Sequence, residues 1–326
     1  MAASSPSLRG GRALGIAALA AALLAPVLAN EAPLLARSTG AICSPALGAL
    51  PLTAWAGCAV ATVDWNRERL SGSKSILLDV PIPFGPEQTN LNAVLKPPGR
   101  SHWLGTDSLG RDVLARVIHG FPIALLVGGL ATLLSLLLGM LVGGIAGLGG
   151  RWVDLGLSRV VDLMACFPTL ILALALAAAA KRPGVASLVI AIGLTRWTGI
   201  ARFFRGEVLR QRGLLYCDAA VAAGAGAPRL LLRHLLPNAL APILITAAFS
   251  ASHAVLLEAG MSFLGLGVPP GTASWGGILA EAQRQVVPAW WLVLFPSLAL
   301  FLTVLGCNLL AEGLRESADP GLSRLG

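Results

Sequence analysis

The stretch PIALLVGGLATLLSLLLGMLVGGIAGL, residues 122–148, contains no charged side chain. A helix rises about 1.5 Å per residue, and about 20 apolar residues are enough to cross the hydrocarbon core of a bilayer. This stretch is therefore long enough to span a membrane with some tilt. It predicts a transmembrane helix and sets the fold class of the chain.

The composition of the whole chain agrees with that prediction. Hydrophobic residues make up 56% of the 326 residues, and charged residues make up 12%. A soluble domain carries about 25% charged residues and cannot bury so much apolar surface inside itself. The excess must face lipid, so the sequence predicts an all-α integral membrane protein.

Further apolar blocks of similar length flank the first stretch. They cover residues 13–29, 163–180, 185–200, 238–263 and 290–310, which gives six predicted transmembrane helices in all. The earliest block follows Arg9 and Arg12 and ends at Ala29. A basic start, a short apolar run and small residues are typical of a cleaved signal peptide, but an uncleaved signal anchor explains the same residues.

Positive charge predicts the orientation of these helices. Arginine supplies nearly all of the net charge of +8, because the chain has only three lysines. The segment 201–236 holds six arginines, whereas residues 264–289 hold only Arg284. Basic loops of membrane proteins stay in the cytoplasm, so segment 201–236 and both termini are predicted to be cytoplasmic. No basic stripe with interleaved aromatic residues is present, so nucleic acid is not a predicted partner.

The polar, proline-rich residues 30–118 form a predicted extracytoplasmic segment. Within it, residues 46–62 are moderately apolar but are interrupted by Pro51, which favours a packed or interfacial piece over a span. Cys43 and Cys58 could form a disulfide if this segment is extracytoplasmic, and the cysteines show no metal-like spacing.

Motifs for covalent chemistry are absent from the sequence. None of the lysines follows the glycines of a phosphate-binding loop, and neither HExxH nor GxSxG occurs. The sequence therefore predicts no enzyme active site, no metal site and no cofactor in this chain. If ATP drives its activity, separate subunits must bind and hydrolyse the ATP.

Small and ionisable residues inside the predicted spans give weaker indications of helix packing and of functional sites. Gly139, Gly143 and Gly147 share one helix face, which favours close packing within the chain over a subunit interface. Glu258 lies twenty residues after Asn238, or about 30 Å along a helix, and is interpreted as an outer-end structural or gating residue. His253 is a candidate cavity residue.

Residues 216–238 read as two short helices separated by glycines. Asp218 suits a first helical turn, Gly224 and Gly226 permit the break, and Pro228 suits the start of the second helix. Pro237 marks the entry to the following span. A basic amphipathic helix on the inner leaflet is the alternative, but the alanine-rich first half is too small to anchor in lipid and suits a protein groove.

This segment resembles the EAA loop of ABC importer permeases, the coupling helix that docks into a cleft on the ATPase subunit. The matching residues are Asp218, Ala219, Ala220, Gly224 and Pro237. Asp218 stands where the family usually has a glutamate and is one methylene shorter.

Other motifs resemble the dipeptide, oligopeptide and nickel "C"-type permeases in particular. The block LGTDSLGRDVL, residues 104–114, is similar to the family's G-T-D-x-x-G-R-D signature, and it makes Asp107, Arg111 and Asp112 structural or gating candidates. Residues 258–267, the SWG at 274–276 and the tail at 313–320 also fit. Residues 29–35 resemble the microcin C/oligopeptide branch, although the external segment is long for the type.

The resemblance implies a bacterial inner-membrane permease of the type I ABC importer fold with an extracytoplasmic insertion after helix 1. It favours an anchor over residues 1–29, followed by the external segment 30–118, a permease domain over 119–312 with its coupling loop at 201–236, and a cytoplasmic tail over 313–326. The implied partners are a second homologous permease, two cytoplasmic ATPases, an extracytoplasmic solute-binding protein and lipid. Peptides are the leading implied substrate.

Competing functions remain at the sequence level. A permease for nickel or another small solute has the same general motifs. A secondary transporter should show intramembrane carboxylates or broken helices in corresponding positions of two repeats, and the sequence shows none. A membrane-embedded enzyme should show a nucleophile and a base, and none is visible.

Overall fold

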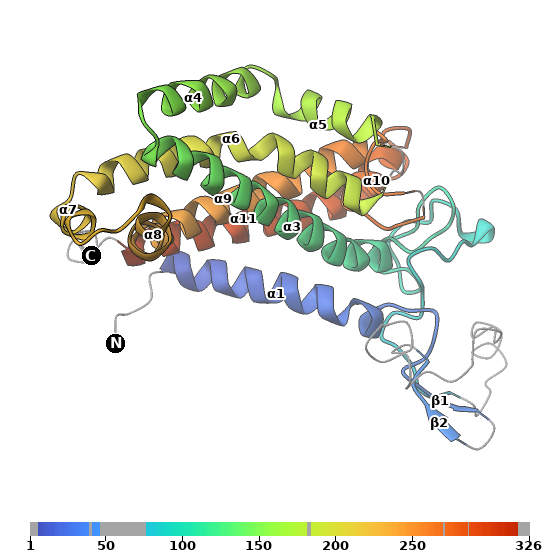
Figure 1. Cartoon of the computed structure of the whole chain (residues 1–326). Helices are drawn as coiled ribbons and strands as arrows, with labels where there is room; N and C mark the ends of the chain where they lie inside the picture. The colour runs from blue at the N-terminus through green and yellow to red at the C-terminus, as the bar shows by residue number, and fades with distance from the viewer. Residues whose placement is uncertain are drawn as a thin grey trace. The chain divides into compact units, whose positions relative to one another are not determined.

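The computed structural model describes residues 6–38, 41–45, 76–180, 184–269, 271–285 and 287–318. This part of the chain is mostly helical (Figure 1). The predicted interfacial piece over 46–62, Cys58 and the Asp319–Pro320 pair of the tail lie outside the described residues.

Long helices dominate the described chain. They are α1 (Pro6–Leu28), α3 (Val113–Leu148), α6 (Val185–Arg212), α9 (Leu236–Phe263) and α11 (Trp291–Ala318). The shorter helices are α4 (Arg151–Ala165), α5 (Thr169–Ala178), α7 (Leu215–Ala222), α8 (Ala227–Leu230) and α10 (Trp275–Ala282). Among the described residues, five helices are long and apolar enough to cross a membrane, or six spans exist if α4 and α5 form one bent span. The all-α membrane fold is thus confirmed.

The third predicted helix, over residues 163–180, is not one straight helix. It breaks after Ala165, and α4 and α5 meet at 85°. Pro168 explains the break, because proline lacks an N–H group and disfavours helical geometry at the residue before it. With ten residues, α5 is only about 15 Å long, too short to cross a bilayer alone.

Other predicted boundaries also differ from the structure, and those of α3 and α6 differ most. Helix α3 begins at Val113 rather than Pro122, and Pro122 lies inside it. Helix α6 continues past Ile200 to Arg212. Helix α3 thus begins before the apolar run, and α6 continues after the apolar run has ended. In both places backbone hydrogen bonding extends the helix into more polar sequence. Apolar blocks locate the membrane-crossing part of a helix better than its ends.

The chain divides into two compact units built from distant segments. One contains Met1–Gly15, Leu126–Met261 and Leu302–Gly326, and the other contains Ile16–Leu125 and Ser262–Phe301. Several long helices contribute to both units, so neither unit corresponds to a single stretch of sequence.

Glycines allow close helix packing in the first unit. A Cβ added to Gly139 would lie 2.6 Å from the Cβ of Ile200, and one added to Gly147 would lie 2.6 Å from a methyl group of Val208. Gly143 meets the backbone of Ala201. The three glycines therefore pack α3 against α6, as predicted for contacts within one chain.

The first helix packs in the same way. A Cβ added to Gly11 would lie 2.4 Å from the backbone nitrogen of Leu310 in α11, and one added to Gly313 would lie 2.5 Å from Leu8. The Ser7 hydroxyl donates to Glu316 Oε2 at 2.6 Å. The amino-terminal half of α1 is thus an integrated helix of its unit.

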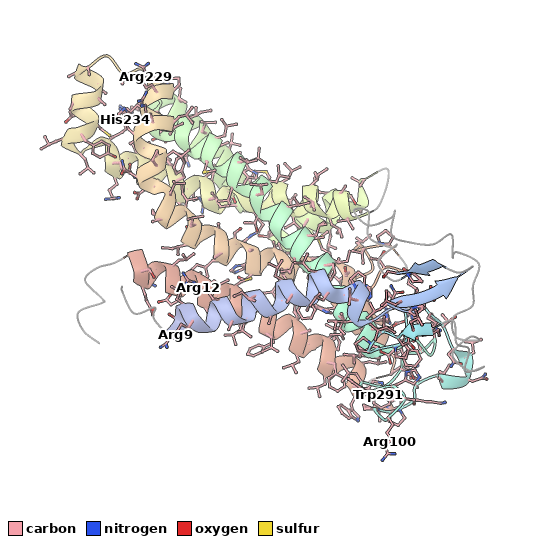
Figure 2. All side chains as sticks on the ribbon, turned by 90° about the horizontal axis from the view of Figure 1, so that it is seen from below. Arg9, Arg12, Arg100, Arg229, His234 and Trp291 are labelled. Atoms are coloured by element: carbon pink, nitrogen blue, oxygen red, sulfur yellow. The ribbon has the colours of Figure 1, made fainter. Side chains whose placement is uncertain are left out.

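The second unit contains a small antiparallel sheet in the order β2-β1-β3, which the sequence did not predict. Strand β1 (Leu35–Ser38) pairs with β2 (Ala41–Cys43) and with β3 (Ile76–Leu78). Indole groups join the other parts of this unit: Trp275 donates to the Val117 carbonyl and Trp291 to the Thr106 carbonyl, each at 3.0 Å. Figure 2 labels Trp291 at this end of the molecule.

Candidate functional site

The predicted coupling loop is a pair of short helices, as the sequence indicated. Helix α7 packs inward through Cys217, which is buried in a cluster with Phe204 and Val208 of α6 and Leu235 and Ile243 farther along the chain. In contrast, the side chains of Asp218 and Ala219 are exposed. Helix α7 therefore has one face fixed to the transmembrane helices and one face available to a partner.

A complete Schellman motif ends α7. Gly224 has φ +82°, its N–H donates to the Val221 carbonyl at 2.9 Å, and the Ala225 N–H donates to the Ala220 carbonyl at 3.0 Å. These two bonds satisfy the last carbonyls of the helix, and the left-handed backbone favours glycine at this position. A Cβ at Gly224 would meet nothing within 4 Å, so neighbouring atoms do not exclude a larger residue. The positive φ of the turn is what favours glycine here.

The chain then enters the membrane through an almost continuous helix. Pro228 lies in the first turn of α8, and a π-helical turn (Leu231–Leu235) joins α8 to α9. Pro237 is the second residue of α9, at the predicted entry to this helix. Arg229 and His234 both lie at this end of the chain's helices (Figure 2).

Polar contacts hold α7 to the end of α6. The Tyr216 hydroxyl donates to Gln211 Oε1 at 2.7 Å, and the Gln211 amide donates to Glu207 Oε1 at 2.7 Å. Burial raises the pKa of the Tyr216 phenol, which keeps it protonated as a donor. Arg212 donates to the Gly147 carbonyl at 2.7 Å and so joins α6 to the last turn of α3. Hydrogen bonds therefore connect α7 to α6, and α6 in turn to α3.

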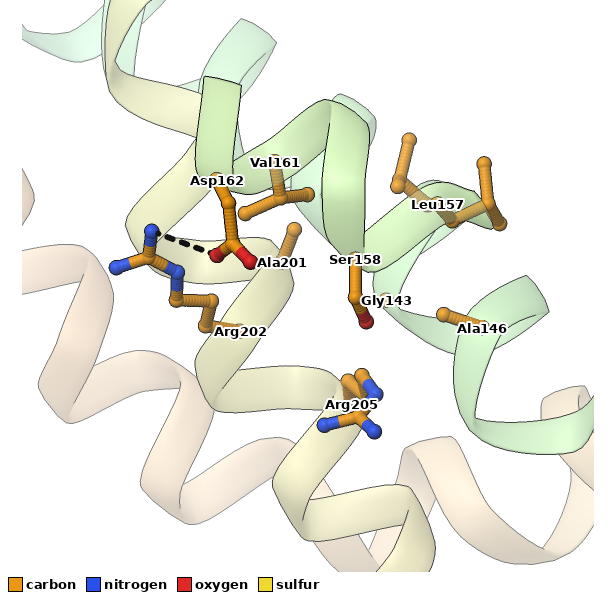
Figure 3. Close-up of a pocket in the computed structure, with 10 residues that line it drawn as sticks. Gly143, Ala146, Leu157, Ser158, Val161, Asp162, Ala201, Arg202 and Arg205 are labelled. Carbon is orange, nitrogen blue, oxygen red and sulfur yellow. Dashed lines mark hydrogen bonds and ion pairs between the residues drawn. The ribbon is translucent and has the colours of Figure 1, made fainter. Parts of the chain in front are cut away.

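A pocket of about 240 Å³ lies beside this region (Figure 3). Its walls come from α3, α4 and α6, where Gly143, Ala146 and Ala201 leave the space. Two ion pairs connect α4 to α6 at its rim: Arg205 with Asp154, 2.7 Å between Nη2 and Oδ2, and Arg202 with Asp162 at 3.2 Å. Each arginine has an acidic partner, so the pocket is close to neutral and offers no unpaired cation for an anion.

Two of the predicted gating or structural residues, Asp107 and Arg111, belong to a buried ionic cluster in the second unit. Asp107 is fully buried and accepts from Arg111 Nε at 2.7 Å and from Arg116 Nη1 at 2.5 Å. Glu281 of α10 completes the cluster, 2.5 Å from Arg111 Nη2 and 2.6 Å from Arg116 Nη1. Two cations thus face two carboxylates, and the cluster ties the loop before α3 to α10.

The third residue of that predicted set, Asp112, has a separate role. One carboxylate oxygen accepts the Ala115 N–H at 2.8 Å and caps the start of α3. The other lies 2.8 Å from Nδ1 of buried His102, whose ring stacks on Phe84 with 4.5 Å between ring centroids. Asp112 therefore fixes where α3 begins.

The structure does not bring Glu258 and His253 together as a site. Glu258 is buried near the end of α9, at the far end of the helix from Asn238. His253 is exposed, and its Nδ1 lies 2.8 Å from the Phe249 carbonyl of its own helix. Five residues along a helix put the two side chains on different faces.

Sequence reasoning missed Arg116, Glu281 and His102. Arg116 follows Asp112 by one helical turn, but this spacing indicates the wrong partner, because Arg116 pairs with Asp107 and Glu281. Glu281 lies 165 residues from Arg116, and no local pattern indicates that contact.

Residues 135–324 match the family described as the binding-protein-dependent transport system inner membrane component. A putative peptide transport system permease protein of Brucella abortus is 41% identical over 241 residues, 74% of this chain and 81% of that protein. A putative peptide permease protein of Brucella suis is 42% identical over 241 residues, with 73% and 80% covered. A dipeptide transport system permease protein of Alkalihalophilus pseudofirmus is 37% identical over 233 residues, with 72% and 76% covered.

Proposed function

The chain belongs to the family of binding-protein-dependent transport system inner membrane components, and from this we propose that it is a permease subunit of an ATP-driven peptide importer. In this proposal it forms the translocation path with a second homologous permease. A solute-binding protein delivers the peptide from outside, and two ATPase subunits bind and hydrolyse ATP. The chain itself carries no cofactor.

The observation that carries the proposal is the geometry of α7. Its inner face is fixed by Cys217, and its outer face presents Asp218 and Ala219. Small side chains on an exposed helix allow close insertion into a groove on another protein, and Asp218 offers one charge for orientation. The contacts of Tyr216 and Arg212 then connect the docked helix to α6 and α3. Closure of the ATPase pair would therefore move the transmembrane helices.

The peptide substrate rests on the relatives, whose names include peptide and dipeptide permeases. We expect deletion of the gene to abolish uptake of short peptides and to give resistance to a toxic oligopeptide, with nickel-dependent enzyme activity unchanged. The measurement is growth on a toxic peptide together with uptake of a labelled tripeptide. Normal peptide uptake with lost nickel accumulation would replace the peptide substrate by nickel and leave the permease function in place.

We also propose that both termini and α7 are cytoplasmic, with α1 retained as an anchor. The packing of Gly11 and Gly313 between α1 and α11 supports retention. In a variant without native cysteines, cysteine replaces Leu91, which is 76% exposed, or Leu215, which is 87% exposed. We expect an impermeant thiol reagent to label the Leu91→Cys variant in intact spheroplasts, and the Leu215→Cys variant only after permeabilisation. The reverse pattern would invert the topology.

A further inference from the structure

An arginine lies inside the apolar part of α6. At about 1.5 Å per residue, Arg196 is roughly 16 Å from Val185 at the start of the helix and roughly 9 Å from Arg202. Insertion scales assign a cost of about 2.5–3.5 kcal/mol to a charge near the centre of a transmembrane helix. A residue at this depth therefore needs water, a counter-charge or a functional reason to be there.

Arg196 has no partner among the described residues. Its Nε is buried and makes no hydrogen bond, and no ion pair includes its guanidinium. The neighbouring arginines of α6 differ, because Arg202 pairs with Asp162 and Arg205 with Asp154. A buried N–H group without an acceptor costs about 1–3 kcal/mol, so the single chain leaves this group unsatisfied.

A second buried side-chain atom of the described residues also lacks a hydrogen-bond partner, and it lies on the adjacent helix α3. It is Oγ1 of Thr132, which is buried in α3. Thr132 shares a helix face with Ser135, whose hydroxyl donates to the Gly193 carbonyl of α6 at 3.0 Å. The two unsatisfied groups therefore come from the two helices that pack together here.

Snorkelling of Arg196 toward the headgroups does not explain this arrangement. Side chains of a helix tilt toward its amino terminus, which for α6 is Val185. This direction leads away from Arg202 and the basic end of the helix, and therefore away from the nearer interface.

We infer that Arg196 is a binding point for a carboxylate of the transported solute, and, since this rests on the proposed function, for the carboxyl terminus of a peptide. A guanidinium presents a planar fork of donors that matches a carboxylate with two parallel bonds. Arg196 is only partly buried in the chain, and Nε is the one nitrogen of its guanidinium that is buried without a hydrogen-bond partner. Gly199, less than one turn away, has open space where a Cβ would lie. The rival partner is a carboxylate of the second permease.

The test compares a short peptide carrying a free carboxyl terminus with its carboxyl-terminal amide, chosen so that the wild-type transporter imports both. The complete transporter is reconstituted in liposomes with its binding protein, and the ratio of acid to amide uptake is measured. Delivery by the binding protein is common to all variants, so its preference cancels when the ratios are compared. We expect Arg196→Gln to lower the acid-to-amide ratio about tenfold and Arg196→Lys to lower it less.

Arg202→Gln is the matched control, because it removes an arginine of the same helix that is already paired with Asp162. Its acid-to-amide ratio should stay at the wild-type value. If Arg196→Gln lowers uptake of both peptides equally, or prevents copurification of the second permease, Arg196 is structural or pairs between subunits and the inference is overturned. If the wild-type transporter imports no peptide of any kind, the proposed peptide substrate is wrong. The role of Arg196 in binding a peptide carboxylate is then wrong as well.

Discussion

Replacing Gly224 with valine should abolish transport while the protein still inserts and assembles. The reason is backbone geometry, because Gly224 has φ +82° and ends α7 in a Schellman motif. A β-branched residue strongly disfavours that region, so the turn must rearrange and α7 must change direction. We expect peptide uptake and substrate-stimulated ATP hydrolysis to fall by more than about tenfold, a loss that corresponds to about 1.4 kcal/mol or more.

Gly226 provides a matched control for this experiment. It also has open space where a Cβ would lie, but its φ is −71°, which any residue adopts. Gly226→Val should therefore retain most transport, and Gly224→Asn should retain more than Gly224→Val because asparagine tolerates positive φ. Both uptake and ATP hydrolysis are measured on complexes of equal subunit content. Full uptake by Gly224→Val would show that this turn does not couple the ATPase to the path.

The helices that cross the membrane could be predicted because their cause is local. A run such as residues 122–148 must satisfy its backbone internally and face lipid, whatever its neighbours do. The two short helices α7 and α8 could be predicted for a similar reason, since Gly224 and Pro228 act on the backbone within a few residues. The prediction was wrong where two local effects compete. The apolar block 163–180 favours one continuous span, but Pro168 within it breaks the helix.

The partners of the charged residues could not be predicted, because they depend on tertiary contacts. Asp107 and Arg111 stand in a recognisable motif, but Glu281 reaches them from another part of the chain. The same limit applies to Arg196. Its position within an apolar block is visible in the sequence, whereas only the structure distinguishes it from the paired Arg202 and Arg205.

Replacing Asp107 with alanine should destabilise the permease by about 3–5 kcal/mol, the cost of removing one partner from a buried ionic group. The carboxylate accepts from Arg111 and Arg116 and also from the backbone N–H of Leu109 at 2.8 Å. Without it, two buried guanidiniums share Glu281 alone, and the cluster carries a net positive charge. We expect the melting temperature of the purified permease in detergent to fall on the order of 10 °C.

Two further variants separate the ionic cluster from a general loss of surface charge. Glu87→Ala removes an exposed carboxylate of the same unit and should change stability by less than about 0.5 kcal/mol. Arg116→Met in the Asp107→Ala background removes one of the two cations that would share Glu281, so the double variant should melt above the value that the two single changes predict together. Because Arg111 and Arg116 connect Asp107 to Glu281 of α10, the loss of Asp107 should also increase proteolysis near Trp275. A loss of about 3–5 kcal/mol should shift the melting temperature by far more than about 2 °C. If Asp107→Ala melts within about 2 °C of wild type, the cluster is not needed to hold these segments together.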